Sequence, residues 1–535
     1  MTDNARKSLY RFDYRRSPDQ GGPVARRPVV VIGAGPVGLA CAIDLVQRGV
    51  PVVLLDDADR IGEGSRGLCY SKRTLEILDR LGVGRACVDK GVTWKLGRVF
   101  QGEDPIYQFD LLPETGHEMP AFVNLQQYYL EHFLVARAGE LDDLEIRWRN
   151  KVVGLAPLND GAQLTIETPD GLYDLQADWV VAADGARSPT RAMLGLDFVG
   201  EAFEERFLIA DVRMSEAFPT ERWFWFDPPF HAGRSALLHK QPDGIWRIDL
   251  GLGADADAHE EQKPENVIPR IRQMLGHSDF ALEWVSVYTF QCRRLERFVH
   301  GRVVFAGDAA HQVSPFGARG ANSGIQDAEN LAWKLARVIQ GRAPASLIDT
   351  YDVERVAAAD ENIGHSTRST DFIAPRTPQE MRFRDAALAL ARRTGFAKRM
   401  VNSGRLSTPS VYRDSPLSTP DAEPWGGSAR LGAPVPDAPM ATPTGEPVWL
   451  LDALGGDAVE IVVSDGPPPA PPPPGVRRIV IGADLIDAQG RFAERFDAVP
   501  GATWLVRPDQ HLAARFRHGD AQRVAAAARR MTGEG

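Results

Sequence analysis

A glycine-rich segment near the start of the chain has the residue types and spacing that bind a nucleotide phosphate. The hexapeptide GAGPVG occupies residues 33–38 and directly follows the apolar run PVVVI at 28–32. Gly33 permits a tight turn, Gly35 lets backbone amides approach a pyrophosphate, and Gly38 lets the next helix pack closely on the strand. The N-terminus of that helix would stabilise the phosphate charge. The segment therefore predicts a phosphate-binding strand–turn–helix unit.

An acidic residue follows at the spacing that such a unit requires. The second apolar run, PVVLLDD at 51–57, reaches Asp56, whose carboxylate can accept hydrogen bonds from a ribose diol. A glycine motif alone is weak evidence, because structural turns also use glycine. Here the strand, the turn, the helix and Asp56 agree, and together they favour a dinucleotide site over a purely structural turn.

Two further polar residues follow, in segments that lack the repeated βα units of an NAD-dependent dehydrogenase. Arg66 lies in the loop GEGSRG, where its guanidinium could engage two phosphate oxygens, although a plain surface arginine fits the same pattern. The next residues predict an amphipathic helix with Leu75, Leu78 and Leu81 on one side. Gln127 stands at the head of a second predicted helix, where it could also be only a polar residue at a helix start.

Two later strands also end in acidic residues. The segment DWVVAADGARSPTR places Asp184 and Gly185 after a strand, and GRVVFAGDAAHQVSPFGARGANSG places Asp308 at the end of another. Ligands of open α/β sheets bind outside the carboxyl ends of the strands, so Asp308 is expected to face the same crevice as the first glycine turn. Three strand ends aimed at one crevice indicate a ligand longer than NAD in a single Rossmann unit.

The bulk composition limits the other classes of function. A chain of 535 residues suggests about three or four domains. Its net charge of -10 gives no basic footprint for nucleic acid or an anionic membrane, and no apolar run approaches the ~20 residues that span a bilayer. The basic stretch in residues 1–27 is interrupted by aspartates, which favours a flexible N-terminal strap over a targeting peptide. The four cysteines have no metal-ligand spacing, so we expect no metal site and buried free thiols in a reducing cytoplasm.

Taken together, the motifs resemble the class A flavoprotein monooxygenases, the single-component aromatic hydroxylases built like p-hydroxybenzoate hydroxylase. The match rests on GAGPVG with Asp56, on DGARSPTR and on AGDAAHQVSPFGARGANSGIQDAENLAWKL, and it covers residues 28 to about 400. Within that family the chain looks most like the phenol-hydroxylase group, which includes the 3-(3-hydroxyphenyl)propionate hydroxylases. The resemblance implies an α/β fold in which a Rossmann-like FAD-binding domain is interleaved with an antiparallel substrate sheet, plus a thioredoxin-like α/β C-terminal domain.

The same resemblance assigns cofactor contacts. Those to the ADP half of FAD and its pyrophosphate would come from Gly33, Gly35, Gly38, Asp56, Arg66 and Gln127, the last two extending toward the ribitol. Asp184 and Gly185 would contact both FAD and a transient nicotinamide cofactor, and Asp308 would bind the ribitol. The residues beside the isoalloxazine would be Pro315, Gly317, Gly320 and Asn322. The helix that follows would start near Asn322 and Ser323. One departure is Asp56-Asp57, where the family often has Glu followed by a basic residue.

The implied reaction is hydroxylation of a phenolic ring, with O₂ and NADH or NADPH, through a flavin C4a-hydroperoxide. Because the flavin itself supplies the oxygen, no serine, cysteine or metal nucleophile is needed. The small phenolic substrate could carry a carboxylate. Two alternatives stay open: a flavin oxidoreductase of the same fold that inserts no oxygen, and a non-catalytic flavin-binding protein.

The expected substrate sheet spans residues 197–295, between FAD-domain segments at 28–196 and 296–400. Its segments alternate like antiparallel strands. Candidates for a base or substrate contact are His231, His239, Arg247 and Tyr288. Each is more often an ordinary sheet residue, so no catalytic base is assigned. The run Trp223, Phe224, Trp225 and Phe226 could line an apolar pocket or belong to the core.

The C-terminal third contains a linker and a small α/β region. Residues 401–430 are rich in Ser, Pro and Gly, and residues 431–535 alternate strands and helices in a way that resembles a thioredoxin-like domain. No cysteine follows Cys292, so dithiol chemistry is excluded there and a structural or homodimer-related role is expected. The run PPPAPPPPG at 467–475 predicts a stiff loop between two strands.

Overall fold

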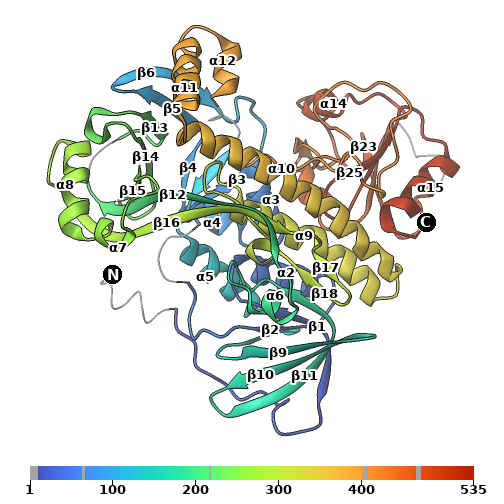
Figure 1. The fold of residues 1–535 in the computed structure, drawn as a ribbon. Helices are drawn as coiled ribbons and strands as arrows, with labels where there is room; N and C mark the ends of the chain where they lie inside the picture. Colours follow the sequence, from blue (N-terminus) through green and yellow to red (C-terminus); the bar gives the residue numbers. More distant parts are fainter. Residues whose placement is uncertain (1–9, 63–66, 216–217, 402–405, 465–470, 535) are drawn as a thin grey trace.

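The computed structural model describes residues 10–62, 67–215, 218–401, 406–464 and 471–534 (Figure 1). Within them, two eight-stranded sheets and a four-stranded sheet are joined by helices, which confirms the predicted α/β fold. Figure 1 shows the C-terminal domain (red) on one side of the long helices α9 (Gly320–Ile339) and α10 (Asp349–Ile373), and one of the eight-stranded sheets (green) on the other. No described helix is long and apolar enough to cross a membrane.

The first sheet carries the glycine turn. Its strands run in the order β17-β18-β11-β1-β2-β8, with β18, β11, β1, β2 and β8 mutually parallel. Val29, Val30 and Val31 are fully buried, as expected of a parallel strand with helices on both faces. The strands are β1 (Ala25–Ile32), β2 (Val52–Leu55), β8 (Leu144–Arg147), β9 (Lys151–Leu158), β10 (Gly161–Thr168), β11 (Gly171–Ala182), β17 (Val299–His300) and β18 (Val303–Phe305).

Helices and a small three-stranded sheet pack around this sheet and position its loops. Helix α2 packs along α9, so the two glycine-rich turns lie at neighbouring helix starts. The elements are α2 (Pro36–Gln47), α3 (Lys72–Arg80), α4 (Gly84–Lys90), α5 (Gln127–Ala138) and α6 (Pro189–Met193), with β3 (Cys69–Ser71), β4 (Val92–Trp94) and β7 (Phe122–Asn124). The predicted amphipathic helix is α3, which buries Leu75 and Leu78.

The second sheet is larger than the predicted 197–295 segment. Strands β5 and β6 join its edge from far earlier in the chain, through parallel pairing of β5 with β13. Its strands are β5 (Leu96–Gln101), β6 (Asp104–Asp110), β12 (Phe198–Arg213), β13 (Arg222–Phe226), β14 (Ser235–Lys240), β15 (Ile245–Gly251), β16 (Ala281–Leu295) and β19 (His311–Gln312). The helices α7 (Ala258–Glu261), α8 (Pro264–Leu275), α11 (Pro378–Ala391) and α12 (Gly395–Met400) accompany it.

The C-terminal domain has the strand arrangement of a thioredoxin-like sheet. The order is β23-β22-β24-β25, in which β22 and β23 are parallel and the other two pairs are antiparallel. Its elements are β20 (Pro439–Ala441), β21 (Pro447–Trp449), α13 (Leu450–Leu454), β22 (Val459–Val463), β23 (Arg477–Ile481), α14 (Arg491–Phe496), β24 (Thr503–Val506), β25 (Leu512–Phe516) and α15 (Ala521–Thr532). Described residues 471–475 of the proline-rich run contain no helix or strand.

The described part of the predicted N-terminal strap lies against the first sheet. The ring of Phe12 stacks on Trp148 with 4.3 Å between centroids. Asp19 is buried and pairs with Arg27 and Arg147, each at 2.6 Å. Specific contacts therefore anchor this segment before β1 begins.

Candidate functional site

Four neighbouring strands bring the predicted cofactor residues to one edge of the first sheet. Strand β18 precedes Asp308, β11 precedes Asp184, β1 precedes Gly33 and β2 precedes Asp56. The strand ends are bonded in series, because Ala306 N donates to Ala182 O at 3.0 Å, Ala183 N to Ile32 O at 2.9 Å and Gly33 N to Leu55 O at 2.8 Å. The prediction that these strand ends face one crevice therefore agrees with the sheet order.

The first glycine turn is closely packed on two sides and open on the third. Gly33 has a φ of +103°, and a Cβ on Gly38 would lie 1.9 Å from the Gly33 carbonyl oxygen. Only glycine fits this crossing of turn and helix. A Cβ on Gly35, by contrast, would meet nothing within 4 Å. Gly35 is the N-cap of α2 and bears no capping side chain, so the start of the helix borders open space as a pyrophosphate cradle requires.

Asp56 lies beside this cradle and is held by backbone amides. One carboxylate oxygen accepts from Ala34 N at 2.6 Å, and the other accepts from Ala58 N at 2.9 Å. Burial raises the pKa of Asp56 above its ordinary value, against the lowering effect of these two bonds. The carboxylate is fixed in orientation while each oxygen keeps acceptor capacity for a ribose hydroxyl.

Gln127 is the first residue of α5 and bonds the backbone at Gly67. Its Oε1 accepts from Gly67 N at 2.9 Å, and its Nε2 donates to Glu131 Oε1 at 2.7 Å. Glu131 in turn accepts from Gly62 N at 2.6 Å. Gly62 and Gly67 are thus both tied to α5. Arg66, the other predicted pyrophosphate contact, lies outside the described residues.

Asp184 and Gly185 form the turn after β11. Asp184 accepts from Thr190 N at 3.0 Å through one carboxylate oxygen, whereas the other is buried and has no partner among the described residues. Gly185 has a φ of +78° and open space on its Cβ side. Arg191 ties the turn to the neighbouring loop by donating to Ala309 O at 3.2 Å.

Asp308 lies in the short turn that follows β18. Its side chain is open to solvent, yet protein surrounds it on most sides, as is typical of a residue in a concave site. This burial within the crevice raises the pKa of Asp308, with Asp327 adding to the rise and His311 opposing it. The carboxylate is thus available to accept hydrogen bonds from a ligand in the crevice.

A buried acidic residue that the sequence analysis missed holds this turn in place. Asp327, on α9, accepts from Gly307 N at 2.9 Å and from His311 Nε2 at 2.7 Å through one oxygen. Its other oxygen accepts from Arg355 Nε at 2.5 Å. Burial would raise the pKa of Asp327, but Arg355 and His311 hold it below its ordinary value. The sequence signal was weak, because Asp327 is one of several polar residues that α9 buries.

The second glycine-rich loop approaches from the other side of the crevice. Pro315 is exposed, Gly317 has a φ of +105°, and α9 begins at Gly320, two residues before the predicted start. Asn322 is 1% exposed and fully engaged in bonds to protein. Its Oδ1 accepts from Ser71 N at 2.9 Å, and its Nδ2 donates to Ala318 O at 2.6 Å. Its side chain therefore fixes β3 against this loop, while Gly317 and Gly320 leave the loop surface free of bulk.

An aromatic cavity lies between this loop and the second sheet. Phe316 and Gly317 line it on the loop side, and Phe224 and Phe226 line it on the sheet side. The remaining lining residues are Arg98, Phe109, Arg222, Ser369, Phe372, Ile373, Val401 and Leu406. Alternation along β13 sends Trp223 and Trp225 to the opposite face, where they pack against Phe218 and Phe230. Half of the predicted aromatic run thus lines the cavity and half is core.

Polar side chains share the cavity face of the sheet. Strand register places His239 opposite Arg247, and Arg247 opposite Asp211, with which it forms a buried ion pair at 2.9 Å. Burial, with Arg222 and Arg247 nearby, holds the pKa of His239 well below its ordinary range, so this imidazole is neutral at pH 7. Burial also raises the pKa of Asp249 to about 6. The other two candidates lie apart: His231 bonds to Gly251 O in a turn, and Tyr288 packs in the cluster around Phe316.

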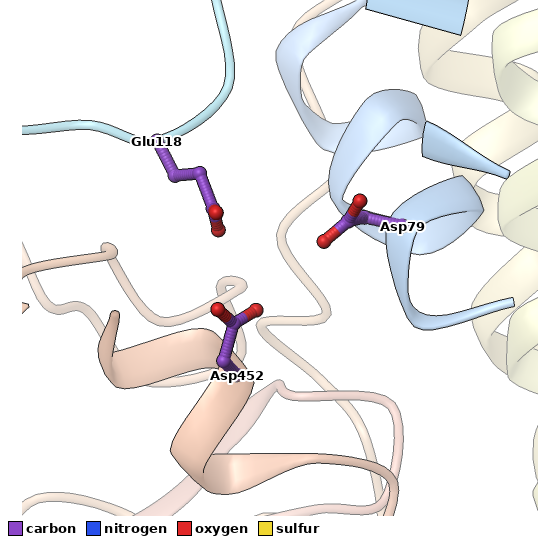
Figure 2. A group of neighbouring side chains, drawn as sticks. All are labelled: Asp79, Glu118 and Asp452. Atoms are coloured by element: carbon purple, nitrogen blue, oxygen red, sulfur yellow. The ribbon is translucent and has the colours of Figure 1, made fainter. Parts of the chain in front are cut away.

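A second group of carboxylates lies outside this crevice (Figure 2). Asp79 of α3, Glu118 of a loop and Asp452 of α13 point toward a common space, so the group joins the first domain to the C-terminal domain. Arg85 pairs with Glu118. Burial and Asp452 raise the pKa of Glu118 to about 7.

The fold and the crevice define a flavoprotein of the FAD-binding Rossmann class with an adjoining aromatic cavity. The open helix start at Gly35, the fixed carboxylate of Asp56 and the open carboxylate of Asp308 follow one another along the strand ends, which suits a ligand as long as FAD. The residues present therefore fit this cofactor.

Known proteins give the family. A family model described as an FAD binding domain matches residues 26–366. A 6-methylpretetramide 4-monooxygenase from Streptomyces rimosus is 31% identical over 527 residues, covering 93% of this chain and 91% of that protein. A 3-(3-hydroxy-phenyl)propionate/3-hydroxycinnamic acid hydroxylase from Mycolicibacterium smegmatis is 29% identical over 388 residues, covering 72% and 68%. The crystal structure of the flavin-dependent monooxygenase PieE with FAD and substrate has a TM-score of 0.81 at 22% identity, covering 96% of this chain and 100% of that one.

The chain therefore belongs to the family of class A flavin-dependent aromatic hydroxylases, as its motifs predicted. It is an FAD-dependent monooxygenase, with NADH or NADPH as the reductant typical of the family.

Proposed function

We propose that the protein hydroxylates a phenol that carries an acidic substituent, using O₂, in the cavity between Phe224, Phe226 and the loop at Phe316. Bound FAD would supply the oxygen-transfer chemistry after reduction by the nicotinamide. The chain's own tasks are to bind the phenol, orient its ring and exclude water. The cavity is lined mainly by aromatic and apolar side chains with a small number of charged groups, as is typical of a small-molecule site.

The observation that carries this proposal is the state of Arg222. Its side chain lines the cavity, and one guanidinium nitrogen is buried without a hydrogen-bond partner among the described residues. A buried unpaired donor is costly, so such groups commonly have a functional reason. The other arginine of the lining, Arg98, already pairs with Glu221 at 2.5 Å. Arg222 is therefore the group we assign to the acidic substituent, as a charge-assisted hydrogen-bond donor.

The aromatic side chains around the cavity would orient the substrate and exclude water. Phe224 and Phe226 line the cavity, and Phe316 packs edge-on against Phe207 at 4.8 Å between centroids. Aromatic walls of this kind hold a planar substrate by stacking and keep water away from the reacting ring. Arg222 at one end then fixes which ring carbon faces Gly317.

The direct test combines a substrate panel with isotope labelling. Purified holoenzyme is supplied with NADH or NADPH and a panel of acidic and neutral phenols under ¹⁸O₂. We expect substrate-stimulated nicotinamide consumption and one ¹⁸O atom in the product, with acidic phenols preferred. Product without the label would contradict the hydroxylase assignment and favour an oxidoreductase that inserts no oxygen. Equal preference for neutral phenols would contradict the role of Arg222 alone.

A further inference from the structure

The C-terminal domain contacts the FAD domain through a buried, fully paired arginine. Arg507 follows β24, and its guanidinium bonds both oxygens of Glu354 on α10, at 2.5 and 2.9 Å. It also bonds Asp509, at 2.9 Å through Nε. Glu354 accepts from Lys334 Nζ of α9 at 2.7 Å, so the charged cluster around Arg507 includes residues of both long helices. Arg507, Glu354 and Lys334 are all at most 1% exposed.

The next residue of α10 continues the contact toward the crevice. Arg355 is buried and bonds Asp327 Oδ1 through Nε at 2.5 Å and Ser323 Oγ through Nη2 at 2.9 Å. Its remaining nitrogen, Nη1, donates to Tyr412 OH at 3.0 Å. Tyr412 stacks on His511 of the C-terminal domain with 4.5 Å between ring centroids. Two separate contacts from that domain, through Arg507 and through Tyr412, therefore converge on the Glu354–Arg355 pair.

The chain of contacts ends at the turn that presents Asp308. Asp327 accepts the backbone hydrogen of Gly307, the residue before Asp308, at 2.9 Å. The guanidinium of Arg507 also lies over the ring of Tyr412, 5.4 Å from its centroid, and so reaches Arg355 through that side chain. We propose that the C-terminal domain is part of the FAD site: Arg507 is a positioning residue that, through Tyr412, Arg355 and Asp327, fixes the Gly307–Asp308 turn in its ligand-binding geometry. The proposal rests on the proposed contact between Asp308 and the ribityl chain of FAD.

Burial of its charged groups makes this series of contacts rigid. Every carboxylate and guanidinium in it is buried, and removal of one partner leaves an uncompensated charge that the others must move to satisfy. Interactions of this kind are coupled in a low-dielectric interior, so a change at Arg507 is not confined to its own contacts. This assigns a function to a domain that has no cysteine for redox chemistry.

The test is FAD affinity of the holoenzyme. Arg507→Met removes the charge and keeps much of the volume, and we expect FAD to dissociate at least tenfold more readily, measured by the rise in FAD fluorescence on dilution. The visible flavin spectrum should shift as the site loosens. Arg507→Lys should fall between wild type and Arg507→Met, because lysine restores one charge and cannot bond Glu354 in a bidentate manner.

A matched control and a milder variant keep the proposal testable. Arg515→Met removes another paired arginine of the same domain, bonded to Asp421 at 2.6 Å, and should leave FAD affinity within twofold of wild type. Tyr412→Phe deletes only the hydroxyl that bonds Arg355 and should weaken FAD binding by about threefold to tenfold. This variant tests the proposal if Arg507→Met fails to fold. Wild-type FAD affinity and spectrum in a folded Arg507→Met or Tyr412→Phe variant would overturn the proposal, even if its unfolding midpoint falls. Asp308→Ala, measured in parallel, tests the ribityl contact separately, because it leaves the Arg507 contacts intact.

Discussion

The carboxylate of Asp327 lies 2.9 Å from the backbone nitrogen of Gly307 and fixes the turn that carries Asp308. The same carboxylate bonds His311 and Arg355, so the turn is held from within the protein and not by Asp308 itself. Substitutions at Asp308 therefore probe the ligand contact with little disturbance of the backbone.

Asp308→Ala should weaken FAD binding by about 10–100-fold, the loss expected for hydrogen bonds to a charged acceptor. The measurement is the FAD dissociation constant, from fluorescence titration of protein freed of flavin. Asp308→Asn should lose less, because its amide oxygen still accepts. A stably yellow Asp308→Ala protein with wild-type affinity would contradict the assigned contact.

The two neighbouring glycines of the first turn should respond differently to alanine. Gly38→Ala should lower the free energy of unfolding by about 1–3 kcal/mol, because the new methyl would lie 1.9 Å from the Gly33 oxygen. Gly35→Ala should fold normally, since its methyl would point into open space, but should bind FAD at least about tenfold more weakly. Urea unfolding and FAD titration of both proteins make the comparison. Normal FAD affinity in Gly35→Ala would show that the open space is not the pyrophosphate cradle.

Arg222→Met should discriminate between acidic and neutral substrates. We expect the dissociation constant of an acidic phenol to rise about 10–100-fold, and that of its methyl ester or amide to change by less than about threefold. Spectral titration of the flavin reports both. Arg98→Met is the matched control, because Glu221 already pairs with Arg98 and its removal should not separate the two ligands. An equal loss for acid and ester in Arg222→Met would argue against charge recognition.

The stability of the holoenzyme should depend on pH through Glu118. Burial and Asp452 raise the pKa of Glu118 from 4.5 to about 7, and Asp79 and Asp437 act in the same direction while Arg85 opposes them. The folded state thus holds this proton more tightly than the unfolded chain. The resulting stability is fully present below pH 4.5 and is lost as the pH rises through about 7.

Glu118→Gln removes this dependence. Between pH 5 and pH 8 (about the window that these pKa values define), its free energy of unfolding should rise relative to wild type by about 1–2 kcal/mol, allowing for partial solvent screening. Urea unfolding at the two pH values gives the difference. Exposed Glu494 serves as the control site, with Glu494→Gln expected to track wild type. Parallel curves for Glu118→Gln and wild type would contradict the prediction.

Local patterns predicted which residues gather at this edge of the sheet, because each strand and its terminal polar residue are contiguous in sequence. Gly33, Asp56, Asp184 and Asp308 all follow strands that the sheet order places side by side. The resemblance also implied Asn322, whose side chain secures β3, and its contact with the flavin stays a prediction.

Contacts between segments that are distant in the sequence could not be predicted from local sequence patterns. Strands β5 and β6 join the second sheet from before residue 111, and the cavity takes Phe109 and Phe372 from elements on either side of the predicted 197–295 segment. Asp327 and Arg507 look like ordinary charged residues until the fold buries them together with Arg355 and Glu354. Tertiary burial, which has no local signature, decides these roles.

The contacts of the adjacent residues Glu354 and Arg355 have a consequence for how the protein binds FAD during its synthesis. Both turns of the FAD crevice precede residues 507–511 in the chain, so during synthesis they emerge while Glu354 still lacks its arginine partner. The nascent FAD domain would then carry the Glu354 carboxylate without its arginine, and the contacts that fix the Gly307–Asp308 turn would be incomplete. We expect tight flavin capture to follow emergence of the last β-strands, which would make cofactor loading a late checkpoint of biosynthesis.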